Sequence, residues 1–71
     1  MRRNVIDRVY DLVSRSYDLI RECEDKLDVV LVLGEEELDQ DLLDEVEEVL
    51  DLLKEARDRM DYVLDELNEN Y

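Results

Sequence analysis

Three acidic residues at helical spacing are the side chains of this sequence best arranged for chemistry. Glu45, Glu48 and Asp51 follow one another at intervals of three residues, which makes them neighbours along one side of a helix. Carboxylate oxygens are ligands that Mg²⁺ prefers, so this row has the character of a magnesium site. The chain contains no histidine, however, and so lacks the commonest metal ligand and general base.

The spacing of these carboxylates resembles that of all-helical nucleotide pyrophosphatases of the MazG type, which use Glu-x-x-Glu and Glu-x-x-Asp pairs from two helices. The resemblance implies a Mg²⁺-dependent enzyme, in which Glu22 and Asp25 would form the second pair. A chain with 23 acidic residues among 71 also produces such spacings by chance. We therefore favour a non-enzymatic protein without cofactor or bound metal, and keep the pyrophosphatase as an alternative.

Cys23 is the only cysteine, so the chain can form no internal disulfide, and a lone thiol favours a cytoplasmic location. Glu22 and Glu24 flank it, and neighbouring carboxylates disfavour the thiolate that a nucleophile needs. Its place in the apolar pattern of the first helix predicts a buried structural thiol.

Acidic residues dominate the second half of the chain. The net charge is −14, and residues 34–71 contribute sixteen acids and three bases to it. This charge argues against direct binding of nucleic acid, because proteins neutralise phosphates with Lys and Arg.

A row of carboxylates three or four residues apart predicts an acidic helix face. Its members are Asp44, Glu47, Glu48, Asp51, Glu55 and Asp58. We expect a small interaction module, of the regulator or inhibitor type, that presents this face to a basic protein. Two alternatives stay open: a solvated face that only keeps the protein dispersed, and a mimic of nucleic acid.

Two long amphipathic helices must position these residues. Residues 38–67 carry a wide apolar stripe at seven-residue spacing, which is typical of a core-facing bundle helix. Its lines are Val46, Leu53, Met60 and Leu67, then Leu42, Val49, Ala56 and Val63, with Leu43, Leu50 and Leu64 beside them. Residues 5–33 show the same period, with Ile6, Val13, Ile20 and Leu27 in one line and Val9, Ser16, Cys23 and Val30 in the next.

The apolar run Val29–Leu33 is ambiguous, because an unbroken β-branched run also suits a short buried strand. We interpret it as the end of the first helix, since the sequence offers no second strand to pair with it. This run is the longest apolar run of the chain and is too short to span a membrane.

The connection between the helices contains the only glycine. Gly34 follows the last periodic residue, so we expect a left-handed conformation there that ends the helix. Asp39 is the expected N-cap of the second helix, with Leu38 and Leu43 packing as a hydrophobic staple. In the alternative, the second helix starts directly after Gly34, with Glu35–Glu37 in its first turn.

The predicted architecture is an all-α antiparallel hairpin in which residues 1–71 form a single domain. A chain this short buries little surface alone, and the stripe of the first helix is wider than one neighbour covers. We therefore expect two hairpins to associate as a homodimeric four-helix bundle. The expected interface comprises Tyr10, Leu12, Tyr17, Leu19, Val46, Leu53, Met60 and Leu67. A monomer, a different partner protein, and a designed or purely structural bundle are the alternatives.

Overall fold

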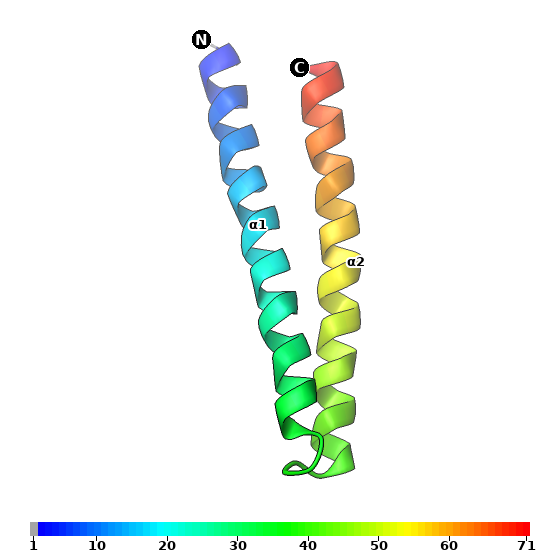
Figure 1. Cartoon of the computed structure of the whole chain (residues 1–71). Coiled ribbons are helices and arrows are strands. Elements are labelled where there is room, and N and C mark those ends of the chain that lie inside the picture. Colours follow the sequence, from blue (N-terminus) through cyan, green and yellow to red (C-terminus); the bar gives the residue numbers. More distant parts are fainter. Residues whose placement is uncertain (1) are drawn as a thin grey trace.

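The computed structural model consists of two long helices joined by a short connection (Figure 1). It describes the backbone of residues 2–71 and the side chains of residues 4–71. Helix α1 spans Arg2–Gly34 and helix α2 spans Gln40–Asn70. The helices run antiparallel, so both chain ends lie at the same end of the molecule. The predicted all-α hairpin is confirmed, and the described residues contain no strand.

The helix boundaries differ from the predicted ones by a few residues. Helix α1 starts before residue 5, and α2 continues beyond residue 67 but starts later than residue 38. The run Val29–Leu33 lies inside α1, so its helical interpretation is confirmed. The chain contains no proline and is rich in leucine and glutamate, so nothing in its composition stops either helix early.

Helix α1 ends at Gly34 without the expected left-handed residue. No residue that the structure describes has a positive φ, so this prediction is wrong. The Gly34 carbonyl instead accepts hydrogen bonds from the backbone N–H groups of Glu37 and Leu38, at 3.1 and 2.8 Å. A Cβ atom at Gly34 would stand 2.6 Å from Leu38 Cδ1, so the glycine makes room for this leucine.

Asp39 caps the start of α2, as the sequence predicts. Its backbone is extended, and its Oδ1 accepts a hydrogen bond from the Leu42 backbone N–H at 2.9 Å. This bond satisfies one of the amide groups that the first helical turn leaves free. Leu38 and Leu43 both lie against Gly34 and close the loop end of the hairpin. Residues 35–39 are not helical, so the alternative start directly after Gly34 is wrong.

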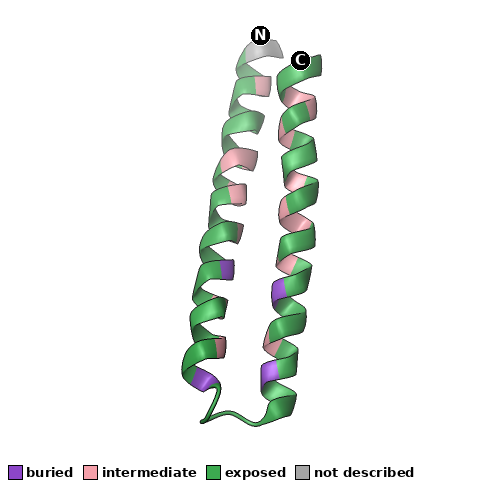
Figure 2. Ribbon diagram, turned by 45° about the vertical axis from the view of Figure 1, so that its right-hand side comes forward, coloured by how far each residue is buried: buried purple, intermediate pink, exposed green. Residues whose placement is uncertain are grey.

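The two helices meet along one seam, where the buried and half-buried positions of α1 and α2 face each other (Figure 2). Within the part of the chain with described side chains, Leu43 and Leu50 are the buried apolar residues, 9% and 4% exposed. Half-buried residues continue the seam: Ile6, Val13, Tyr17, Ile20, Leu27 and Leu31 of α1, and Val46, Leu53, Met60, Leu64 and Leu67 of α2. Because full burial of a leucine stabilises by about 1.5–3 kcal/mol, this is a small core.

The seam uses only part of each predicted apolar stripe. In α2, Val49 and Val63 are 44% and 39% exposed, and in α1, Val9 and Val30 are 38% and 37% exposed. Cys23 is exposed as well, so the prediction of a buried thiol is wrong. A helix with one neighbour can cover about two adjacent lines of a stripe, and these residues belong to a third line.

The hairpin is a single layer of two helices. Its Cα atoms extend over 54 × 14 × 12 Å, and the chain exposes 5960 Å² of surface. A compact protein of this mass exposes about 4,700 Å². The hairpin therefore exposes roughly 1,300 Å² more than a compact fold of the same chain would.

Candidate interaction surfaces

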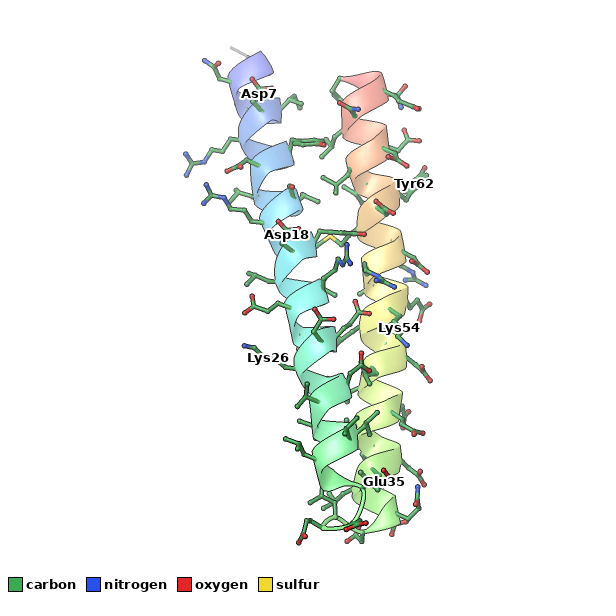
Figure 3. All side chains as sticks on the ribbon, viewed as in Figure 1. Asp7, Asp18, Lys26, Glu35, Lys54 and Tyr62 are labelled. Carbon is green, nitrogen blue, oxygen red and sulfur yellow. The ribbon has the colours of Figure 1, made fainter. Side chains whose placement is uncertain are left out.

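The acidic face of α2 is fully accessible. All six predicted carboxylates are exposed: Asp44, Glu47, Glu48, Asp51, Glu55 and Asp58. Tyr62, which follows Glu55 by seven residues, projects from the side of α2 away from α1 (Figure 3). The acidic face therefore points away from α1. Two of its carboxylates have partners on their own helix, since Gln40 Nε2 donates to Asp44 at 2.8 Å and Arg59 contacts Glu55 at 2.9 Å.

The negative charge is also uneven along the length of the hairpin. Residues 20–57 form the half nearest the connection and carry fifteen acids and four bases, a net charge of −11. The half at the chain ends carries the other eight acids and five bases, a net charge of −3. One end of the molecule is therefore much more acidic than the other.

A second surface consists of exposed aliphatic side chains. We define the apolar face as Val5, Val9, Leu12, Leu19, Val30 and Leu33 of α1, together with Leu42, Val49, Leu52 and Val63 of α2. Leu12, Leu19 and Leu33 are 52%, 65% and 73% exposed, and Leu52 is 59% exposed. Lys26 stands within this face, in the seven-residue line of Leu19 and Leu33, and points away from α2 (Figure 3).

The apolar residues of α1 and α2 lie on the same side of the hairpin. On α1, Val9 precedes the seam residue Val13 by four positions, and on α2, Val49 precedes the seam residue Leu53 by four positions. Both helices are right-handed and run antiparallel, so residues with the same offset from the seam turn to the same side. The apolar face is thus one continuous surface over both helices.

An ion pair crosses the seam between α1 and α2. Glu24 Oε2 lies 3.5 Å from Arg57 Nε, and the Glu24 side chain is 7% exposed while that of Arg57 is 30% exposed. Glu24 Oε2 has no hydrogen-bond partner among the described residues, so its charge is compensated by proximity to Arg57 rather than by a hydrogen bond. The pair therefore sets two opposite charges into the middle of an otherwise apolar seam.

The sequence analysis did not predict this ion pair, although the sequence contains a pattern that indicates it. Glu24 stands in the seven-residue line of Tyr17 and Leu31, and Arg57 stands in the line of Leu50 and Leu64. One of the two seam lines on each helix is thus interrupted once, by charges of opposite sign on the two helices. When two antiparallel helices place such interruptions level with each other along the seam, the opposite charges indicate an ion pair between the helices.

The residues predicted for a dimer interface lie in three different places. Val46, Leu53, Met60 and Leu67 are half-buried in the seam of their own hairpin, as is Tyr17. Tyr10 lines a shallow hollow at the chain ends, together with Ile6, Asp7, Leu67, Asn68 and Tyr71. Leu12 and Leu19 belong to the exposed apolar face. For all eight residues, contact with a partner chain stays a prediction.

The carboxylates that suggested a metal do not form a site with other ligands. Among the side chains of residues 4–71, no group of three or more Cys, Asp or Glu residues is arranged so that it could hold a metal ion. Glu45, Glu48 and Asp51 lie on the exposed surface of α2. Cys23 is exposed and unpaired on α1. Neither helix, over its described residues, has an apolar stretch long enough to cross a membrane.

Comparison of the chain with protein-family models, with curated proteins and with solved structures yielded no match. The two surfaces of the hairpin and its charge are therefore the features from which a function can be inferred.

Proposed function

We propose that this protein is a non-enzymatic interaction module that works as a homodimeric four-helix bundle and presents acidic faces to a basic partner protein. The observation that carries the proposal is the division of the hairpin surface. The acidic face points away from α1, whereas the apolar face lies on one side of both helices. Self-association through the apolar face would leave both acidic faces free for the partner.

The charge pattern of the acidic face supports a role in recognition. Like charges three or four residues apart on a helix destabilise it by a few tenths of a kcal/mol for each pair, roughly 0.2–0.5. Glu47, Glu48 and Asp51 are exposed neighbours that form none of the salt bridges within the described residues. A basic partner would relieve this repulsion and would be attracted over a distance set by the salt concentration. The proposal places the protein in the cytoplasm, where a single cysteine stays reduced.

The test compares two variants with the same loss of charge. The first carries Glu47→Gln, Glu48→Gln and Asp51→Asn on the acidic face, and the matched control carries Asp18→Asn, Asp25→Asn and Asp28→Asn on α1. Each variant is titrated with an arginine-rich peptide at low and high salt. We expect the acidic-face variant to lose most of the binding and the control to retain it. Equal losses would show that only the total charge matters and would contradict the proposal.

Two further assays separate the alternatives. Competition by duplex DNA for a nucleic-acid-binding protein would favour the nucleic-acid mimic. Thermal stabilisation by millimolar Mg²⁺, beyond that of monovalent salt at equal ionic strength, would favour the Mg²⁺-dependent enzyme.

A further inference from the structure

We propose that the apolar face is covered by a second copy of this chain, stacked so that the two connections lie at opposite ends of the bundle. This inference rests on the homodimer of the proposed function, and it assigns the interface and the orientation of the two copies.

The total surface area of the hairpin leaves room for a contact of the size that a stable dimer needs. The hairpin exposes about 1,300 Å² more than a compact protein of its mass, whereas a stable interface needs about 800 Å² from each partner. Leu12, Leu19 and Leu52 are each more than half exposed on one continuous face. A second copy offers the same aliphatic surface, and a two-fold axis pairs the face with itself.

Charged residues interrupt the apolar face at Lys26 on α1 and at Glu45 and Arg59 on α2, which stand in the lines of Leu19 and Leu52. Both cations are paired with carboxylates of their own helix, Lys26 with Glu22 at 3.4 Å and Arg59 with Glu55 at 2.9 Å. A partner would therefore meet them as ion pairs rather than as isolated charges.

The hydroxyl group of the apolar face is also paired. Ser16 stands in the same line as Val9 and Val30, and its hydroxyl donates to the Leu12 carbonyl at 2.9 Å. Its polar group is therefore paired within α1 before any contact forms. Ser16 and Ala56 are half-buried small residues of this side, so the two layers can approach closely near the middle of the hairpin.

The charge along the hairpin decides between the two ways of stacking. A two-fold axis parallel to the helices would place both −11 halves at one end of the bundle. A two-fold axis across the helices places the −11 half of one copy against the −3 half of the other. The second arrangement roughly halves the product of the facing charges, and with it their mutual repulsion. The charge therefore favours connections at opposite ends.

The interface is tested first, by sedimentation equilibrium of two matched variants. Leu19→Gln changes a residue of the apolar face that is 65% exposed, and Val32→Gln changes a residue outside this face that is 72% exposed. Both substitutions leave the charge unchanged. Because a dimer contains two copies of each change, we expect Leu19→Gln to raise the dimer Kd by about 100-fold or more. We expect Val32→Gln to raise it less than about twofold, since surface changes away from contacts cost little.

The orientation is tested by distances between spin labels. Because Cys23 is the only cysteine, a Cys23→Ser background allows one label at the connection, through Glu36→Cys, or near the chain ends, through Asn4→Cys. In dimers labelled at residue 36 we expect a long separation, comparable to the 54 Å length of the hairpin. Mixed dimers with one label at residue 36 and one at residue 4 should show a short separation.

The outcomes distinguish the parts of the proposal. A short distance between two labels at residue 36 would overturn the orientation but keep the dimer. Equal effects of Leu19→Gln and Val32→Gln would overturn the interface. A folded chain with a mass of 8.5 kDa at every concentration would overturn the homodimer itself. None of these results would change the comparison of acidic variants with the arginine-rich peptide, which tests partner binding separately.

Discussion

Removal of Arg57 should destabilise the hairpin far more than removal of Glu24, because Glu24 is the buried member of the pair. The substitution Arg57→Met would leave the Glu24 carboxylate, 7% exposed, without a cation. Breaking a fully buried ion pair in this way costs about 3–5 kcal/mol. Water already reaches the Arg57 side chain, which is 30% exposed. We therefore expect a smaller loss of stability, about 2 kcal/mol.

Glu24→Leu should cost much less, because the remaining charge can move to water. Arg57 has a long flexible side chain and is partly exposed, so its guanidinium can reach solvent while its stem covers the seam. The leucine would also complete the apolar line of Tyr17 and Leu31. We expect Glu24→Leu to change stability by less than about 1 kcal/mol, and the variant with leucine at both positions to be at least as stable as the parent.

The assay is thermal unfolding followed by circular dichroism, with all variants at one protein concentration because association shifts Tm. For a chain of this size, 2 kcal/mol corresponds to a decrease in Tm of about 8–16 °C. Arg15→Met is the matched control, since it breaks the exposed Asp11–Arg15 pair on α1, whose side chains are 58% and 74% exposed. We expect the control to lose no more than about 0.5 kcal/mol. Equal losses for Arg57→Met and Arg15→Met would refute the reasoning that burial makes the Glu24 charge costly.

Four other predictions concern the ends of the helices, the seam and the total charge. Gly34→Ala should change the free energy of unfolding by less than about 1 kcal/mol, because Leu38 can move and no positive φ demands glycine; a loss above about 2 kcal/mol in urea would contradict this. Asp39→Ala should cost about 1 kcal/mol and Asp39→Asn almost nothing, measured in the same way, since only alanine removes the cap. Leu50→Ala should lower the free energy of unfolding by about 2–3 kcal/mol, whereas Val32→Ala should lower it by less than about 0.5 kcal/mol. Similar losses for the two variants would show that Leu50 is not part of the core. Tm should rise between about 0.05 and 1 M NaCl, because salt screens the repulsion within a chain of net charge −14, and a decrease would argue against that repulsion.

The helical hairpin was predictable because its signals are local. The seven-residue period, the absence of proline and the capping residue Asp39 each act within a few residues of the chain, and the two helices and the cap that they predict are confirmed. The conformation of Gly34 was not predictable in the same way. A glycine at the end of a helix usually indicates a residue in the left-handed conformation. Here the absence of a side chain at Gly34 instead leaves space for the Leu38 side chain. That need arises only once the chain has folded back on itself.

The exposure of Cys23 has the same origin. Its seven-residue line on α1 is mostly apolar, and so are the lines on either side, so periodicity alone could not say which lines a single neighbour would cover. The seam formed instead along the line that contains Glu24, where Arg57 compensates the charge. The sequence contains both charged residues, but whether they contact each other depends on the axial position of α2 relative to α1.

The sequence by itself determined the class of the fold, the positions of the two helices and the location of the acidic face, because these follow from propensity, period and charge along one chain. The tertiary structure decided which apolar lines are buried, since α1 has only α2 as a neighbour and their contact covers one side of each helix. It thereby also decided that Leu12, Leu19 and Leu52 share one exposed surface. That surface exists because two antiparallel helices turn equivalent residues to the same side.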